Sequence, residues 1–385
     1  MHKIAILSLC LTLTGLPVSV LAAPGGAVES VSTKTVSVSS KSELIKALHS
    51  ITQPTTIFLQ RGSYGHLRLT DAALPPGTTI SSSDSRRPAS FDGISLKGIR
   101  NLKLANISIA PPASGTVAGR YGMLILNSRH VDLENVDFHG STRWRGQKSN
   151  SGLMIRNSSN VTVSKSYFTK FQHGISIQKV RNTTIELNEF ERLRTDAIRG
   201  GGVNRLEIRG NVVTNFEPAK GDHPDGIQLW STRQKEPGRY VTVEDNLVVR
   251  GSGDPIQGIF IRDTRLRLPF RDLNISGNLV IGGLYNGITV LGAEDVRVNS
   301  NTVLARKDQK SWIRLEYTRD ARITGNSANA FVINNNRAKP RLSGNQTNSA
   351  SNGDMSRLIS KWARSKKVFA SHRGEVLQRL MRYGR

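Results

Sequence analysis

The segment Leu206-Glu-Ile208-Arg-Gly-Asn211-Val-Val213 alternates apolar and polar residues and then places an asparagine before a second short apolar run. The pattern, apolar-x-apolar-x-x-Asn-x-apolar, returns along most of the chain at intervals of about 19 to 35 residues. Such self-similarity is typical of a solenoid. Close copies occupy residues 241–248, 273–280, 296–303 and 321–328, and looser copies occupy 102–109, 131–138, 161–168, 183–190 and the surroundings of Asn345.

A second short motif, Gly-apolar-x-apolar, lies between these copies, as in Gly174-Ile-Ser-Ile and Gly226-Ile-Gln-Leu. Alternation with a period of two predicts strands, and helical spacing is absent from this region. One unit is too small to bury its own apolar face, so the units must stack, roughly 4.8 Å apart. The sequence therefore predicts an all-β fold, a single-stranded right-handed parallel β-helix of about ten coils.

One asparagine recurs at the same place in each copy. Stacked asparagine side chains bond the turn backbone of their own and neighbouring coils, and asparagine tolerates unusual turn dihedrals. We therefore expect a structural ladder and not a ligand site. Its expected members are Asn188, Asn211, Asn246, Asn278, Asn301, Asn326 and Asn345.

The two ends of the solenoid are expected to differ from its coils. Ser40-x-x-Glu43 is a capping box, which predicts a short helix within an N-terminal segment of residues 23–50. Residues 51–348 form the predicted β-helix, and residues 349–385 a basic helical tail with apolar faces. We expect this tail to cap the solenoid; a tether to membrane or polysaccharide is the alternative.

Residues 1–22 have the features of a cleavable signal peptide. Lys3 precedes a run of about a dozen apolar residues, which is too short to span a bilayer, and Pro17 ends the run. An N-terminal membrane anchor is the alternative. The only cysteine, Cys10, would leave with the signal. We expect a bacterial periplasmic or secreted protein without a disulfide or an integral membrane segment.

The chain is strongly basic, with a formal net charge of +25 and a pI near 10.7. Such a charge attracts anionic partners, although it also keeps a protein soluble. Export makes acidic polysaccharide the expected partner and nucleic acid the least expected one. The oligomeric state is left open, with a monomer as one possibility.

Residues 35 to 348 resemble the pectate-lyase-like right-handed β-helix superfamily of bacterial polysaccharide lyases, hydrolases and epimerases. The resemblance rests on the repeat, on the opening at residues 57–64, and on Asp222-His-Pro-Asp-Gly-Ile-Gln-Leu-Trp230. Mannuronan C5-epimerases and alginate lyases of this superfamily carry clusters of His and Asp on one sheet. Their Asp-Pro-His-Asp sequence has the composition, but not the order, of residues 222–225. Polygalacturonase-type hydrolases use an adjacent Asp pair, and this chain has no Asp-Asp dipeptide.

Alignment of the Gly-apolar strands predicts three columns of side chains along the axis, one just before the Gly and two after it. Polar, cationic and aromatic residues concentrate in the coils between His173 and Arg262. These residues form one predicted patch. Its members are Ser176, Gln178, Arg199, Gln228, Trp230 and Arg262, with His173, Asp196 and Asp225 along its edge, and Arg156 and Arg314 further along the same columns.

Long insertions flank the same strands and are expected to form the walls of a groove. They carry Arg143, Trp144, His223 and Arg265. Arginine binds carboxylates in a bidentate fashion, and tryptophan offers a flat apolar surface to a sugar ring. The spacing of the coils is comparable to the length of one sugar unit, so a chain along the axis would meet a new coil at each sugar.

The patch predicts chemistry on a uronate polymer. Removal of the C5 proton requires neutralisation of the adjacent carboxylate, which Arg199 or Arg262 would provide. His223 is the first candidate for the base and His173 the second. A Tyr or a protonated Asp would supply the acid that completes β-elimination or C5 epimerisation.

Two alternatives remain at this level. Asp196 and Asp225 fall on neighbouring coils and would serve a glycoside hydrolase, which needs two carboxyl groups. A polysaccharide-binding or export scaffold without catalysis is the other alternative. No cofactor is expected: the resemblance allows calcium, but the dense carboxylate spacing that calcium needs is missing from the sequence.

Overall fold

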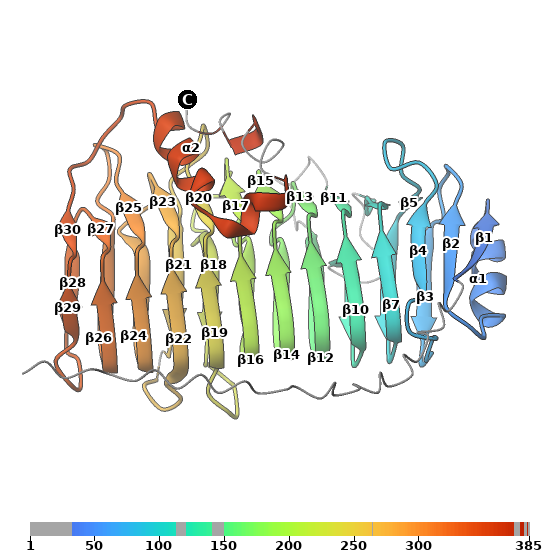
Figure 1. The fold of residues 1–385 in the computed structure, drawn as a ribbon, viewed down its shortest axis with the longest axis horizontal. Coiled ribbons are helices and arrows are strands. Elements are labelled where there is room, and N and C mark those ends of the chain that lie inside the picture. Colours follow the sequence, from blue (N-terminus) through green and yellow to red (C-terminus); the bar gives the residue numbers. More distant parts are fainter. Residues whose placement is uncertain are drawn as a thin grey trace, which may run out of the picture. The chain divides into compact units, whose positions relative to one another are not determined.

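The computed structural model describes residues 33–112, 121–140, 150–263, 265–372, 378–380 and 383. The predicted signal peptide, and Arg143 and Trp144, lie outside the described residues. From Thr33 onward the chain forms one compact unit. Its strands pair in parallel in each coil-to-coil contact and stack into a solenoid (Figure 1). No helix among the described residues has the length and hydropathy needed to cross a membrane.

Each complete coil contributes strands to three rows. The first row begins at the Gly-apolar motif, and its strands pair coil to coil along the solenoid. In the part of the chain that the structure describes, six strands lie wholly in the first row: β3 (His66–Thr70), β6 (Gly93–Lys97), β9 (Tyr121–Leu126), β18 (Asp225–Trp230), β21 (Gln257–Arg262) and β28 (Phe331–Asn334). Five longer strands contribute only their first parts: β12 (Ser151–Ser164), β14 (Ile175–Glu186), β16 (Ile198–Arg209), β24 (Asn286–Asn299) and β26 (Trp312–Thr324).

The second row carries the apolar-x-apolar half of the repeat. In five coils it simply continues the first-row strand around a corner, so that two rows share one strand. Its separate strands are β1 (Lys34–Val38), β2 (Thr55–Leu59), β4 (Thr79–Ser82), β7 (Arg100–Ala105), β10 (Arg129–Glu134), β19 (Arg239–Glu244), β22 (Phe270–Ser276) and β29 (Arg341–Ser343).

The third row follows the repeated asparagine and forms a sheet of its own. Its strands are only two or three residues long because the chain turns again at once. They are β5 (Ser90–Phe91), β8 (Ser108–Ile109), β11 (Asp137–His139), β13 (Tyr167–Thr169), β15 (Glu189–Glu191), β17 (Val212–Thr214), β20 (Leu247–Val249), β23 (Leu279–Ile281), β25 (Thr302–Leu304), β27 (Ser327–Ala328) and β30 (Gln346–Thr347).

The asparagine ladder is structural. Oδ1 of Asn246 accepts from the backbone N–H and from Nδ2 of Asn211, each at 3.0 Å, and Nδ2 of Asn246 donates to the carbonyl of Ile208. The same three bonds recur at the next rungs, and Asn246 is fully buried. Because buried polar groups must be paired, the ladder satisfies the corner backbone that leads into the third row.

The solenoid interior is packed with Ile, Val, Leu and Phe from all three rows. Phe138, Phe168 and Phe190 stack on successive coils, with ring centroids 4.3 and 5.0 Å apart. At the N-terminal end, α1 (Lys41–His49) buries Leu44 and Leu48 against the first coil, and Oγ of its N-cap Ser40 accepts from the N–H of Glu43. This helix therefore covers the core at that end.

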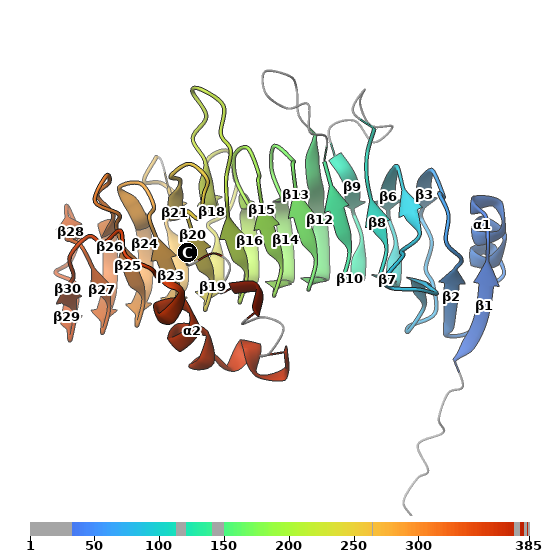
Figure 2. The same ribbon diagram turned by 90° about the horizontal axis from the view of Figure 1, so that it is seen from above.

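Where the structure describes it, the C-terminal tail does not cover the opposite end of the solenoid. Its helix α2 (Ser356–Arg364) and the 3-10 helix η1 (Lys367–His372) fold back along the solenoid beside β20 and β23 (Figures 1 and 2). Phe369 and other apolar residues of the tail pack on outward side chains of the third row such as Leu247 and Leu279. Nε1 of Trp362 donates to the carbonyl of Gly277 at 2.7 Å. The expectation of a terminal cap was wrong, because the apolar residues of the tail pack on the third row instead.

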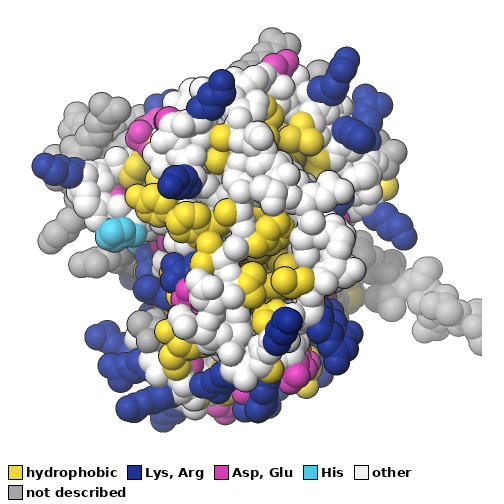
Figure 3. Space-filling view, turned by 90° about the vertical axis from the view of Figure 1, so that its left-hand side faces the viewer, with side chains coloured by type: hydrophobic (Ala, Val, Ile, Leu, Met, Phe, Trp, Pro, Cys, Tyr) yellow, Lys and Arg dark blue, Asp and Glu magenta, His cyan; other side chains and the backbone are white. Residues whose placement is uncertain are grey.

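The end of the solenoid formed by β28, β29 and β30 presents apolar side chains to the outside, surrounded by basic ones (Figure 3). Leu342 is 57% exposed, and Phe331 and Ile333 are only partly buried. Among the described residues, no helix covers this end.

Candidate functional site

The predicted columns are in register. Ser176 pairs with Arg199, Arg199 with Gln228, and Gln228 with Phe260. In the second column Trp230 pairs with Arg262. The register is not uniform along the row: it shifts at Asn286 of β24, which pairs with Trp312. The first-row strands therefore bring the central residues of the predicted patch onto one face.

At the start of these strands, Asp196, Arg199 and His173 form a contact network. Nη1 of Arg199 lies 2.9 Å from Oδ2 of Asp196 and also donates to Nε2 of His173. Since arginine only donates, Nε2 of His173 accepts, and the ring proton is assigned to Nδ1, which faces Oγ of Ser151 at 3.0 Å. His173 thus orients Arg199, and its own basic nitrogen is occupied.

Burial dominates the ionisation of this network. Burial, followed by the charge of Arg199, lowers the pKa of His173 to about 3. Burial raises the pKa of Asp196 to about 6, although Arg199 acts in the opposite direction. At neutral pH, His173 is neutral and Asp196 is mostly ionised.

Asp225 lies in the next coil and is 2% exposed. Its backbone N–H donates to Oδ1 of Asp196 at 3.1 Å, and its Oδ2 accepts from Nε2 of Gln228. Its Oδ1 is buried without a hydrogen-bond partner. Burial raises the pKa of Asp225 well above its usual range, and the charge of Asp196 raises it further. A raised pKa favours the protonated form, and this makes Asp225 a candidate general acid.

Aromatic side chains and arginines cover the same face. The guanidinium of Arg199 lies 5.0 Å from the ring centroid of Trp230, and that of Arg262 lies 5.4 Å from the ring centroid of Phe260. Arg262 makes no ion pair with any described residue, and its Nε is buried without a partner. Its charge lowers the pKa of Asp225, which shows that it lies close to this carboxyl. Arg262 is therefore the cation of this face that remains available to an anionic ligand.

His223 is not joined to this network. It lies in the loop that precedes β18, is exposed, and makes no hydrogen bond or ion pair with a described residue. The adjacent Asp222 instead pairs with Arg194, Nε to Oδ2 at 2.7 Å. Burial works against ionisation of Asp222, but bonds from Arg194 and from the N–H of Ala219 leave its pKa below the usual range.

The other predicted binding residues lie at the margins of the face. Ser176 is nearly buried, Gln178 is partly exposed and Arg156 is exposed, all on coils before Asp196. Arg265 is exposed in the connection after β21. Arg314 is held by Glu316 at 2.8 Å. These residues extend the face along the axis and do not touch the Asp196–Asp225 centre.

Sequence reasoning left Phe260, Ser151 and Glu316 out of the predicted site. Phe260 and Glu316 stand in the aligned columns and were detectable there. Ser151 precedes His173 in the column just before the Gly, so the sequence placed them on neighbouring coils, but the bond between them depends on the corner rotamers and was not predictable. The described residues contain no cluster of three His, Cys, Asp or Glu side chains placed to hold a metal ion.

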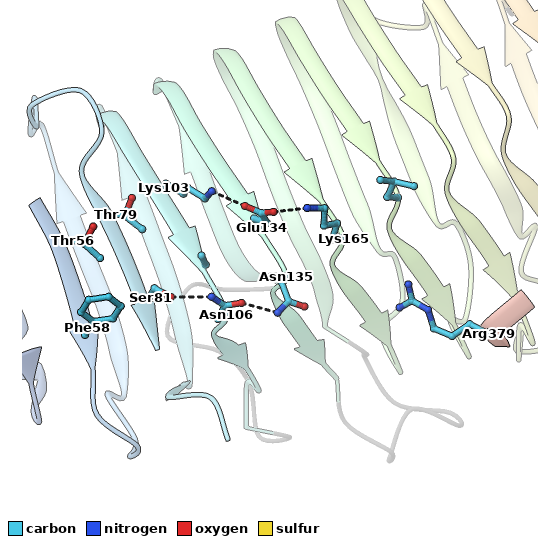
Figure 4. A pocket seen from close by; sticks show the side chains of 12 residues that line it. Thr56, Phe58, Thr79, Ser81, Lys103, Asn106, Glu134, Asn135, Lys165 and Arg379 are labelled. Atoms are coloured by element: carbon cyan, nitrogen blue, oxygen red, sulfur yellow. Dashed lines mark hydrogen bonds and ion pairs between the residues drawn. The ribbon is translucent and has the colours of Figure 1, made fainter. Parts of the chain in front are cut away.

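A separate hollow of about 640 Å³ lies over the second row. Figure 4 shows Lys103 and Lys165 converging on Glu134 within it, at 2.6 and 2.7 Å. Hydrogen bonds from both lysines lower the pKa of Glu134 to about 2. Each of these three side chains thus has an ion-pair partner, in contrast to Arg262 of the first row.

Comparison with known proteins gives the family. The family model for the right-handed β-helix region matches residues 77–248 and 121–303, which together span more than half of the chain. The chain belongs to the right-handed β-helix family. No curated protein sequence matches it significantly.

Solved structures share the fold at low sequence identity. The surface adhesin PfbA of Streptococcus pneumoniae has a TM-score of 0.52 and 12% identity, with 81% of this chain and 89% of that chain covered. A mannuronic-acid-specific family 6 polysaccharide lyase from human gut microbiota has a TM-score of 0.52 and 14% identity, with coverage of 90% and 98%. At such identities these likenesses show a common fold, and one fold hosts many activities.

Proposed function

We propose that this β-helix protein is an exported enzyme that acts on an acidic, uronate-containing polysaccharide by β-elimination or C5 epimerisation. The observation that carries the proposal is the buried Asp225 carboxyl, which is bonded through its backbone to Asp196 and lies near the unpaired Arg262, and whose pKa is raised by burial. An acid, a base and a cation for the substrate carboxylate thereby meet on one face.

In the proposed reaction, Arg262 binds the uronate carboxylate and neutralises its charge. The Asp196 carboxylate takes the C5 proton, and the electron pair of the C–H bond moves into the enolate of the uronate. In elimination, this pair forms the C4–C5 double bond while the C4–O bond breaks, and Asp225 protonates the departing oxygen. In epimerisation, Asp225 returns a proton to the other side of C5.

Both carboxyl groups are covered by outer side chains, Asp225 by its bond to Gln228. A sugar therefore reaches Asp225 only after Gln228 turns away. Trp230 supports the sugar ring, and the Arg199–His173 contact keeps Asp196 in place. His223 is the alternative base, because its loop leads directly into β18.

The test is incubation of the mature chain with a panel of uronate polymers, with detection of unsaturated uronates by absorbance and of epimer ratio by NMR. A new double bond establishes a lyase, and a changed epimer ratio without it establishes an epimerase. If neither signal is found with a folded protein, the proposal fails.

Glycoside hydrolysis is the second candidate, and a specific observation favours it. Asp196 and Asp225 lie on neighbouring coils as a pair of buried carboxyl groups, and a hydrolase needs two such groups. Hydrolysis would release new reducing ends without a double bond, so the same incubations separate the two candidates. The fold likeness to a polysaccharide lyase supports carbohydrate chemistry in general but does not choose between them.

A further inference from the structure

A column of basic residues follows the corner between the first and second rows, where each second-row strand begins. Strand register places one residue of the column on each coil. The column therefore runs parallel to the solenoid axis. Its members in order are Arg100, Arg129, Ser159, Arg181, Asn204, Arg239, Arg271, Glu294 and Arg319.

The column is compensated only at its C-terminal end. Glu294 pairs with Arg271 at 3.3 Å and with Arg319 at 3.2 Å. Arg129, Arg181 and Arg239 make no ion pair with any described residue, and the first two are exposed. Like charges at intervals of one or two coils, about 5 to 10 Å, repel one another, so the fold gains nothing from this row. The arrangement is explained by an anionic ligand.

A cavity of about 310 Å³ opens at the middle of the column. It is lined by Lys179, Arg181 and Asn204 on the solenoid and by residues 234–237 of the connection between β18 and β19. Oδ1 of Asn204 is buried there without a hydrogen-bond partner, and so is Nε of the neighbouring Arg239. Unpaired buried groups are costly, and a ligand relieves the cost.

The unpaired groups define the chemistry of that ligand. Oδ1 of Asn204 needs a donor such as a sugar hydroxyl, and Nε of Arg239 needs an acceptor. The exposed cations Lys179 and Arg181 favour an acceptor that carries negative charge. A ligand with both groups at each repeat of its chain is an acidic polysaccharide. Single-stranded nucleic acid needs free aromatic faces. The aromatic residue at this corner, Tyr240, is 49% exposed, but the guanidinium of Arg205 lies 5.1 Å from its ring centroid and occupies one face of the ring.

We propose that this corner is a second binding site for an acidic polysaccharide, centred on the cavity between Arg181 and Arg239 and extending along the column to Arg129. It lies at the opposite end of the first-row strands from Asp196 and Asp225. The inference rests on the proposed function only for the class of polymer, because it needs no reaction. A polymer held here stays attached while the first-row face acts on another part of it.

The test measures binding of fluorescently labelled alginate by anisotropy, with neutral dextran and oligo-dT as competitors. The double variant Arg181→Gln, Arg239→Gln is compared with Arg271→Gln, Arg319→Gln, which removes the same charge from the compensated end of the same column. We expect the first variant to bind about tenfold more weakly and the second less than twofold, since solvated pairs each contribute little. Denaturation midpoints verify that both variants fold.

Three outcomes overturn the inference: equal weakening in both variants, displacement of alginate by oligo-dT at lower concentration than by unlabelled alginate, or no binding of alginate by the unmodified chain. A failure of the proposed function looks different. In that case alginate binds and Arg181→Gln, Arg239→Gln weakens it, but no product forms with any polymer.

Discussion

The backbone N–H of Asp225 donates to Oδ1 of Asp196 at 3.1 Å, although the two residues lie 29 positions apart. This bond joins neighbouring coils at the start of β16 and β18 and fixes two carboxyl groups side by side beneath the first-row face. The remaining groups of the site are arranged around this pair.

Asp225→Asn removes the proposed general acid while preserving the shape of the side chain. We expect product formation on the active polymer to fall by about 10²- to 10⁴-fold, the usual contribution of a general acid. Product analysis by absorbance and NMR measures the effect. Asp132→Asn, an exposed carboxylate of the second row, is the control. Full activity of Asp225→Asn would remove this residue from the mechanism.

His173 makes the protein sensitive to acid. Its pKa falls from 6.5 in the unfolded chain to about 3 in the folded one, so the unfolded chain binds the extra proton between these values. The free energy of unfolding due to this group therefore decreases as the pH falls from about 6.5 to 3. His173→Gln keeps an acceptor for Arg199 and should lose less stability in acid. Urea unfolding from pH 7 downward tests this; parallel curves for both proteins contradict it.

The carboxyl of Asp196 changes the pH dependence of stability in the opposite direction. Its folded pKa of about 6 lies above the unfolded 3.8, so the folded state binds the extra proton in this range. The stability from this group is present below the lower value and is lost as the pH rises to about 6. The free energy of unfolding of the Asp196→Asn variant should therefore decrease less than that of the unmodified chain over the same rise in pH. A steeper fall in the variant would show that the carboxyl is not protonated in the folded state.

Arg262→Gln removes the unpaired cation of the site. We expect kcat/KM on a uronate polymer to fall by about ten- to a hundred-fold, since a hydrogen bond to a charged group contributes roughly 1.5–3 kcal/mol. Arg250→Gln is the matched control. Nη1 of Arg250 pairs with Oδ2 of Asp308 at 2.6 Å, and Arg250 lies outside the first-row face. Equal losses in both variants would point to net charge and not to a contact with substrate.

Asn246→Ala breaks the middle of the asparagine ladder. It leaves the N–H of Asn211 and the carbonyl of Ile208 buried and unpaired, so we expect a loss of about 3–5 kcal/mol in the free energy of unfolding. Asn345→Ala, at the partly exposed end of the ladder, should cost only about 1 kcal/mol because water replaces its bonds. Chemical denaturation compares the two, and equal costs would refute a ladder stabilised by burial.

Phe369→Ala tests the docking of the tail. This ring is fully buried against the third row, and its removal should cost about 3–5 kcal/mol. Lys367→Ala, an exposed neighbour in the same 3-10 helix, is the control. If Phe369→Ala matched the control in its denaturation midpoint, the tail would not be held as the structure has it.

Much of the first-row face was predictable from the sequence. The columns of Arg199, Gln228 and Phe260, and of Trp230 and Arg262, followed from aligning the Gly-apolar strands, because parallel stacking places equivalent residues at the same height. The shift at Asn286 was not predictable, since a bulge depends on how β24 and β26 pack.

The position of the tail could have been predicted from the third-row strands. The third-row triplets at β17, β20 and β23 are almost wholly apolar, as strands are when both faces are buried. Their outward side chains needed a cover, and the tail supplies it. The mistake was to assign the tail to the open end of the solenoid.

The sequence by itself determined the fold and the identity of the face, because period-two alternation, the repeated asparagine and the Gly-apolar motif are local and repeat in every coil. Only the tertiary structure decided which residues share a proton or a charge. His173, Asp196, Arg199 and Asp225 interact through corner rotamers and burial, and these depend on three neighbouring coils at once. For the same reason, only the tertiary structure shows that His223 lies apart from the Asp196–Asp225 pair and that Arg262 is unpaired.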